Sequence, residues 1–173
     1  DPELEEPMGS WTATLNRVLA GDYDDATAEE RAAATRDLIE LCSSGAAAAS
    51  IQPIPFLDIV LISPIQVGLV QGIGRIHGHR LDQKAIIEMI GSFGASILAQ
   101  NLIIAATKFV PIAGWVAGAA MAYALTWAIG DVANQYFTHG RGITPQELKE
   151  RFKQSFRDKK AENLIPPLWG LRT

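Results

Sequence analysis

The sequence predicts an all-α fold, a compact helical bundle of about five to seven helices around a central apolar helical hairpin. Two observations lead to this class. Every long apolar segment either repeats with the helical period or continues unbroken, and the stretch 112–130 contains no charged residue. The 173 residues suffice for one domain with a substantial core. We expect a linker over residues 1–10, a single helical domain over 11–160 and an extended tail over 161–173.

The N-terminal third contains two predicted helices. The first covers residues 11–19 and ends before Gly21. The second begins at a capping box, because Thr27 is followed three residues later by Glu30. Its apolar residues fall on one face of the helix, and the prolines that follow the alanine-rich stretch 45–50 end it.

The stretch 51–74 is rich in isoleucine, leucine and valine, so it must be tested as β-strand. Its only charge is Asp58. A strand is disfavoured because Pro64 would remove a backbone donor and because the polar residues do not alternate. We expect either one helix that starts near Asp58 and kinks at Pro64, or two short helices that meet there. The glycines and basic residues of 72–80 predict a basic turn, and an amphipathic helix capped by Asp82 follows.

The apolar stretch 112–130 carries the most informative pattern. Small residues recur every four positions and form a stripe along which another helix can approach closely. The stripe consists of Gly114, Gly118, Ala122, Thr126 and Gly130. It predicts helix packing in a membrane or at a dimer interface, and the alternative is a central helix of a soluble bundle. Length does not decide, because roughly 28 Å of helix only just crosses a hydrocarbon core.

This stretch and the helix before it, which turn at residues 108–111, predict a hairpin that dips into a bilayer. The preceding helix has Gln100 and Asn101 deep inside it, which makes it a poor lipid-facing span. The flanking arginines Arg75, Arg80 and Arg141 would stay on one side of the membrane, as the positive-inside rule requires.

The C-terminal helix is basic. A second capping box, Thr144 with Glu147, starts it, and Pro145 occupies its first position. We expect its basic side chains to contact a membrane or another anionic surface. These side chains are Lys149, Arg151, Lys153, Arg157, Lys159 and Lys160.

No pattern in the chain indicates catalysis. The single cysteine, Cys42, excludes a disulfide framework and has no histidine pattern near it, and a paired His77 and His79 are more typical of an exposed turn than of a metal site. We therefore expect no enzyme activity, no cofactor and no metal. A net charge of −4 disfavours nucleic acid as a partner.

Three charges border the apolar segments and are candidates for an ion pair or a switch. They are Asp58, Lys108 and Asp131. The alternative is that they serve as helix caps and turn charges.

A pattern of proline, glycine and apolar positions resembles the YcjF-like domain of unknown function that occurs with Era-like GTPases in bacteria. The residues that carry it are Ile54-Pro55 through Asp58 to Gln66, Leu102 to Lys108 with Pro111 to Gly114, and Ala124 to Gly130 with Tyr136-Phe137 and Gly140. The resemblance implies a helical, membrane-associated module that is fused to a small GTPase or works beside one. Because the sequence has no phosphate-binding loop, the GTPase would be a partner.

Two functions follow from these observations. The first is a non-enzymatic helical adaptor that couples a GTPase to a membrane or a larger assembly, in the cytoplasm at the inner face of the membrane. The second is a soluble structural or oligomerisation domain with no membrane role, whose apolar hairpin is simply its core. The expected partners are a GTPase, a membrane and a second copy of the chain.

Overall fold

A computed structural model describes residues 6–79, 83–92, 94–139 and 142–164. Within these ranges every regular element is a helix, which confirms the predicted all-α class. The helices are α1 (Glu6–Ala20), α2 (Ala28–Ser50), α3 (Leu57–Ile76), α4 (Gln83–Gly91), α5 (Gly94–Thr107), α6 (Ala113–His139) and α7 (Pro145–Leu164).

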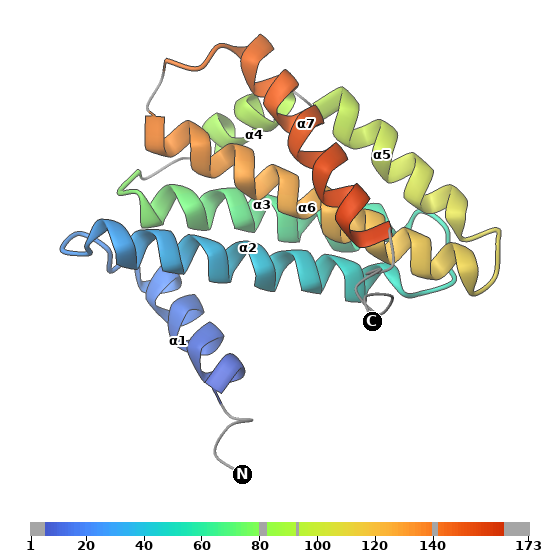
Figure 1. The fold of residues 1–173 in the computed structure, drawn as a ribbon, viewed down its shortest axis with the longest axis horizontal. Helices are drawn as coiled ribbons and strands as arrows, with labels where there is room; N and C mark the ends of the chain where they lie inside the picture. Colours follow the sequence, from blue (N-terminus) through green and yellow to red (C-terminus); the bar gives the residue numbers. More distant parts are fainter. Residues whose placement is uncertain (1–5, 80–82, 93, 140–141, 165–173) are drawn as a thin grey trace, which may run out of the picture.

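The longest helix, α6, forms the centre of the bundle, and α2, α3, α5 and α7 all pack against it (Figure 1). Leu125 and Ile129 of α6 meet Leu69 and Ile73 of α3 in the fully buried core. The loops 51–56 and 108–112 lie together at one end of the bundle, whereas the turn between α1 and α2 lies at the other end (Figure 1). The fold therefore has two distinct ends.

The stretch that begins near Asp58 forms one continuous helix, α3, with Pro64 inside it. The helix extends further than expected, and the predicted basic turn is reduced to its last residues because α3 ends at Ile76. Gly72 thus belongs to the helix and not to the turn. A Cβ atom there would lie 2.5 Å from Leu38 Cδ2, so this glycine allows α2 and α3 to pack closely.

The amphipathic helix predicted after the basic turn is divided into α4 and α5. The break follows Gly91, where Ser92 Oγ donates a hydrogen bond to the Met89 carbonyl 2.7 Å away and closes the end of α4. Two glycines so close together weaken a helix, which explains the division. Asp82, the expected cap, lies outside the described residues.

The outer helices extend beyond their predicted limits. α1 begins at Glu6, inside the stretch expected to be a linker, and α7 continues to Leu164, past the expected domain end at residue 160. Residues 165–173 of the expected tail lie outside the described ranges.

Both predicted capping boxes are present. Thr27 Oγ1 accepts from the Glu30 N–H at 3.2 Å, and Glu30 Oε2 accepts from the Thr27 N–H at 2.7 Å. Thr144 and Glu147 repeat this arrangement at the start of α7. The hydrogen bonds from the cap N–H groups lower the pKa values of both glutamates.

Candidate functional site

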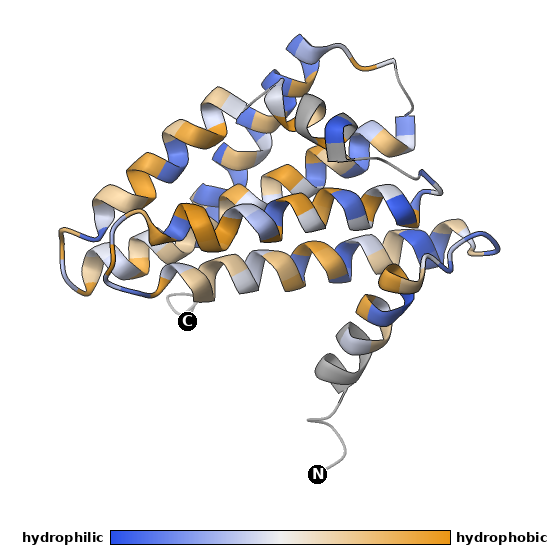
Figure 2. Cartoon of the chain, turned by 180° about the vertical axis from the view of Figure 1, so that it is seen from behind, coloured by the Kyte–Doolittle hydropathy of each residue, from blue (hydrophilic) through white to orange (hydrophobic). Residues whose placement is uncertain are grey.

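The end of the bundle that carries the loops 51–56 and 108–112 exposes large apolar side chains. Phe56 is 57% exposed, Phe109 73% and Ile112 71%. Orange predominates on α5, which also has blue turns, and on the first turns of α3 beside these loops (Figure 2). We call the exposed residues of 51–68 and 95–116 the apolar end.

Polarity in the apolar end is inverted relative to a protein surface in water. Every exposed residue of 51–68 and 95–116 is apolar or a glycine. None of the polar side chains of the same stretches is exposed: Asp58, Gln66, Asn101 and Lys108 are buried, and the others are half-buried. A charged side chain is rarely fully buried unless it is paired, whereas an isolated exposed leucine is ordinary. The combination of buried charge and a continuous apolar exterior is the unusual feature.

The buried charges form an ion pair directly beneath the two loops. Lys108 Nζ lies 3.5 Å from Asp58 Oδ1, and both side chains are fully buried. The same ammonium group donates to the Ser50 carbonyl, which ends α2, and to Ser50 Oγ at 3.3 Å. One lysine therefore ties together the end of α2, the start of α3 and the end of α5.

The 51–56 loop is attached to this pair through Gln52. Gln52 Nε2 donates to Asp58 Oδ1 at 2.9 Å, and Gln52 Oε1 accepts from the Ile54 N–H at 2.7 Å. Asp58 Oδ2 has no hydrogen-bond partner among the described residues. The loop's exposed apolar residues are thus held by a polar network behind them.

Each loop contains a residue in the left-handed backbone region. Phe56 has a φ of 68° and Ile112 a φ of 65°. Such a conformation is uncommon outside glycine and is least favourable for a β-branched residue, at a cost of about 1–3 kcal/mol each. Both residues directly precede a helix, α3 or α6, and both are exposed. The strain is therefore located in the part of the surface with the most exposed apolar side chains.

The three predicted switch charges do not form one group. Asp58 and Lys108 are paired, but Asp131 lies further along α6, where it accepts from Gln135 Nε2 at 3.0 Å and from Ser155 Oγ at 2.7 Å. Asp131 thus joins α6 to α7 and has no contact with the ion pair.

The small-residue stripe of α6 is fully buried inside the chain's own bundle. A Cβ atom at Gly118 would lie 2.6 Å from Thr107 Oγ1 of α5, and one at Gly130 would lie 2.6 Å from Ile39 Cγ1 of α2. Thr126 Oγ1 accepts from Gln66 Nε2 of α3 at 3.3 Å. A second copy of the chain cannot reach the stripe without displacing these helices, so a homo-oligomer stays a prediction that requires another surface.

The basic side chains of α7 lie apart from the apolar end. α7 runs along the C-terminal half of α6: Arg151 donates to Gln135 Oε1 at 2.7 Å, and Lys159 lies 4.6 Å from the Trp127 ring centroid. Arg151, Lys153 and Arg157 are exposed, while Lys149, Lys159 and Lys160 are half-buried. Their contact with an anionic surface stays a prediction.

The cysteine and histidines occupy ordinary structural positions. Burial raises the pKa of the Cys42 thiol to about 11, which keeps it protonated at neutral pH. His77 Nε2 shares a 2.9 Å hydrogen bond with Asn134 Oδ1, and its ring stacks on Phe137. Among the described residues, no group of three or more histidine, cysteine or acidic side chains is arranged to hold a metal.

Two helices are long and apolar enough to cross a membrane by length and composition, α3 and α6. In their most apolar windows, 44% of α3 and 67% of α6 is buried inside the bundle. A core helix of a soluble protein passes the same test. The length and composition of these two helices are therefore weaker evidence for membrane contact than the exposed apolar side chains of the apolar end.

Sequence reasoning missed the contributions of Ser50, Gln52 and α5. Gln100 and Asn101 were expected to weaken α5 as a lipid-facing segment, but Asn101 is buried and Gln100 is half-buried, while Leu98 and Leu102 face outward. The helical spacing of Leu98 and Leu102 does mark one apolar face, and only the tertiary structure shows that this face points away from the bundle.

Comparison with known proteins adds two findings. The family described as Domain of unknown function (DUF697) matches residues 16–165. Magnetosome membrane protein 22 from Magnetospirillum gryphiswaldense is 27% identical over 127 residues, which cover 67% of this chain and 65% of that relative. The chain thus spans less than two thirds of the relative's length. No solved structure matches the chain.

Proposed function

The chain belongs to the DUF697 family of domains of unknown function, and we propose that it is a non-enzymatic helical adaptor whose apolar end attaches it to a membrane while its charged half binds a GTPase. The relative named as a magnetosome membrane protein supports the membrane part of this proposal. The resemblance to GTPase-associated domains supports the other part.

The inverted polarity of the apolar end carries the proposal. The inner face of α5 buries Ile97 and Ile104 together with Asn101. Its outer face nevertheless exposes Leu98, Leu102 and Ile103. In water an outer face is usually polar, because burial of apolar area is the dominant favourable term in folding. Hydrocarbon removes that preference. Transfer of Phe109, Ile112 and Val116 alone into a bilayer would contribute on the order of 3–6 kcal/mol. This is enough for reversible attachment.

The charged half of the bundle remains in water in this arrangement. A cavity of about 760 Å³ lies between α2 and α6, and its lining includes Arg31, Arg36 and Asn134. These residues precede Glu40 on α2 or follow Trp127 on α6, so they lie further from the apolar end, on a part of the surface suited to a soluble partner. We place the GTPase on this side, at the cytoplasmic face of the membrane.

Co-flotation with lipid vesicles tests the membrane role. We expect the parent chain to float and the Phe109→Ser/Ile112→Ser variant to lose at least about tenfold of its partitioning. Leu19→Ser is the matched control, because Leu19 is 64% exposed but lies on α1 at the other end. If the folded parent stays in the aqueous fraction with every vesicle, the membrane role is wrong and the soluble structural domain is the better account.

Binding to a GTPase encoded beside this chain tests the adaptor role. Calorimetric titration in the GDP-bound and GTP-analogue-bound states should give saturable binding that differs between the states. Arg36→Glu should weaken it, whereas Phe109→Ser should leave it unchanged. Absence of binding in both nucleotide states contradicts the coupling and leaves the membrane role intact.

A further inference from the structure

The residues around the apolar end also indicate how deeply the bundle enters the membrane. We infer that the apolar end enters a single leaflet to the level of one contact cluster, formed by Glu40, Tyr123, Trp127 and Lys159. This inference rests on the proposed function, because it concerns the same surface. It predicts that the described helices attach to one leaflet and do not cross the bilayer.

The measure of depth comes from α2. Glu40 is the last charged residue of this helix, and residues 41–50 continue without charge to the apolar loop. At roughly 1.5 Å per residue this uncharged part is about 15 Å long. A bilayer's hydrocarbon core is about 30 Å thick, so one leaflet supplies about 15 Å. The length of the uncharged end of α2 therefore matches the hydrocarbon thickness of one leaflet.

On α6, the residue that bonds Glu40 lies at a similar distance from the apolar loops. Residues 113–122 separate the 108–112 loop from Tyr123 and again give about 15 Å of helix. The Tyr123 hydroxyl donates a hydrogen bond to the Glu40 carboxylate of α2. The two helix lengths thus end at a single point, where one bond joins the two helices. Burial and the acceptor carboxylate raise the pKa of Tyr123, so its hydroxyl keeps the proton that it donates.

The chemistry of this level fits a membrane–water interface. Tyrosine and tryptophan are enriched there because their rings are apolar and their edges polar. Lys159 Nζ lies 5.9 Å from the Tyr123 ring centroid and 4.6 Å from that of Trp127, and 3.0 Å from Glu162 Oε2. A lysine at this height can reach lipid phosphates. Lys160 adjoins it at the same level.

The remaining basic residues of α7 lie further from the membrane. Arg151 pairs with Gln135, which is about 12 Å beyond Trp127 along α6. Lys149 and Lys153 lie on the same part of α7. The last turns of α7, which also carry exposed Glu162 and Asn163, are therefore at headgroup height, and its first half stays in water.

A transmembrane arrangement of α6 is disfavoured by its bonds to its neighbours. Asp131 binds Ser155 of α7, and Tyr123 binds Glu40 of α2. To cross the bilayer, α6 would have to draw these charges into hydrocarbon or separate from both helices. Either outcome costs several kcal/mol per charge.

Fluorescence quenching in vesicles distinguishes the two depths. Two single-tryptophan variants are used, one that retains Trp115 in the first turn of α6 and one that retains Trp127, with the other tryptophans replaced by phenylalanine. With phosphatidylcholine brominated in mid-chain, we expect quenching of Trp115 at least about twofold greater than that of Trp127. Flotation and circular dichroism of both variants verify binding and folding.

Stronger quenching of Trp127 than of Trp115 would overturn the inference, because a crossing α6 places its centre at the bilayer midplane. Flotation would persist in that case, so the proposed function would stand. Failure of the parent chain to float with any vesicle would overturn both the single-leaflet depth and the proposed membrane attachment.

A charge experiment gives a second readout that leaves every tryptophan in place. On vesicles with about 30% phosphatidylserine, Lys159→Gln/Lys160→Gln should weaken binding by about 25-fold, since each lysine near the surface contributes about fivefold. Lys149→Gln/Lys153→Gln is the matched control and should change binding by less than about twofold. Equal effects of the two pairs would contradict the assigned depth.

Discussion

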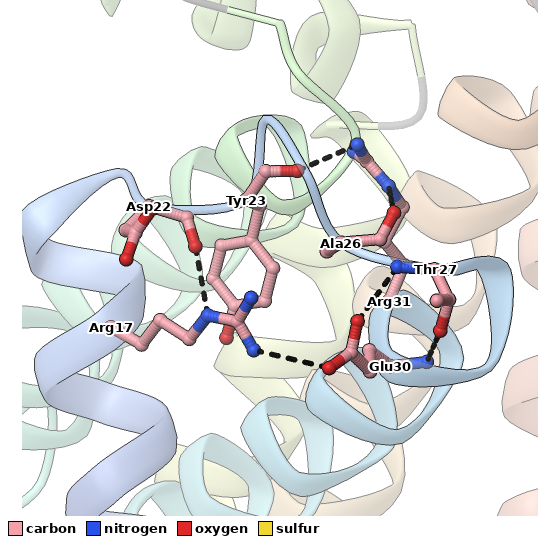
Figure 3. A network of polar contacts seen from close by, with 7 residues as sticks. All are labelled: Arg17, Asp22, Tyr23, Ala26, Thr27, Glu30 and Arg31. Carbon is pink, nitrogen blue, oxygen red and sulfur yellow. Dashed lines mark hydrogen bonds and ion pairs between the residues drawn. The ribbon is translucent and has the colours of Figure 1, made fainter.

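At each end of the bundle, a cationic side chain donates a hydrogen bond to a carbonyl at the end of a helix, but the two cations differ in their exposure to water. Where α1 meets α2, half-buried Arg31 donates to the Tyr23 carbonyl (Figure 3). It also donates to the carbonyl of Ile76, which lies at the end of α3. At the apolar end, Lys108 donates to the Ser50 carbonyl at the end of α2. Both cations satisfy a carbonyl that the helix leaves unpaired. Arg31 reaches water, whereas Lys108 is fully buried with Asp58.

The helices α5 and α7, which both pack on α6, show the same contrast. α7 buries Leu148, Phe152 and Phe156 and exposes most of its charges, as expected for a helix in water. α5 buries Asn101 and exposes Leu98 and Leu102. The polarity of each outer face indicates the surroundings that suit it. The outer face of α7 suits water, and the outer face of α5 suits an apolar environment.

The largest expected effect would come from Lys108→Met. This variant leaves Asp58 buried without its counter-charge, so we expect a loss of about 3–5 kcal/mol in the free energy of unfolding. Urea unfolding followed by circular dichroism measures it. Asp58→Asn/Lys108→Met should recover most of the loss, because it removes both charges.

Lys84→Met serves as the control, since Lys84 is exposed on α4 and should change stability by less than about 0.5 kcal/mol. Equal stability of Lys108→Met and Lys84→Met would show that the apolar end has no buried charge, and the contrast between the ends would disappear.

Gly114→Ala should have the next largest effect. A Cβ atom there would lie 1.9 Å from the Thr107 carbonyl oxygen, and backbone cannot yield as a side chain can. We expect destabilisation of about 1–3 kcal/mol. Gly68→Ala, on an exposed part of α3 with no atom within 4 Å, should instead stabilise by about 0.5–1 kcal/mol. If both substitutions changed the free energy of unfolding in the same direction, the close contact of α5 and α6 at Gly114 would be contradicted.

At the polar end, Arg31→Met should cost about 1–2 kcal/mol. It removes charged hydrogen bonds to Tyr23 and Ile76, but water can replace part of them because Arg31 is only half-buried. Arg36→Met, on the exposed face of α2, should be nearly neutral. Thermal melts of the two variants test this. A loss as large as that of Lys108→Met would mean that exposure to water does not distinguish the two ends.

The smallest expected effect is the loss, at acid pH, of the stability that Glu30 contributes. The capping hydrogen bonds lower the pKa of Glu30 below its ordinary value of 4.5. A depressed carboxyl pKa contributes stability above the unfolded value, and that stability is lost as the pH falls through the folded pKa. The difference in melting temperature between the parent and Glu30→Gln should thus be constant near neutral pH and shrink below about pH 4.5. A difference that grows in acid would have the wrong sign.

The sequence by itself determined the features that depend on near neighbours. Thr27 with Glu30 and Thr144 with Glu147 define helix starts because a capping box is complete within four residues. The spacing of Leu148, Phe152 and Phe156 defines the buried face of α7 because this helix meets water on its other side. The all-α class follows from the same local periodicity.

The tertiary structure alone decided which faces turn outward at the apolar end and which distant residues meet there. Asp58 and Lys108 appeared in the sequence as separate border charges, and only the packing of α3 against α5 brings them to 3.5 Å. The face of α5 could not be predicted either, because an apolar stripe marks a buried face only if the surrounding solvent is water. A pattern along one helix does not specify that solvent, and only the tertiary structure shows that Asp58 and Lys108 are buried while Leu98 and Leu102 are exposed.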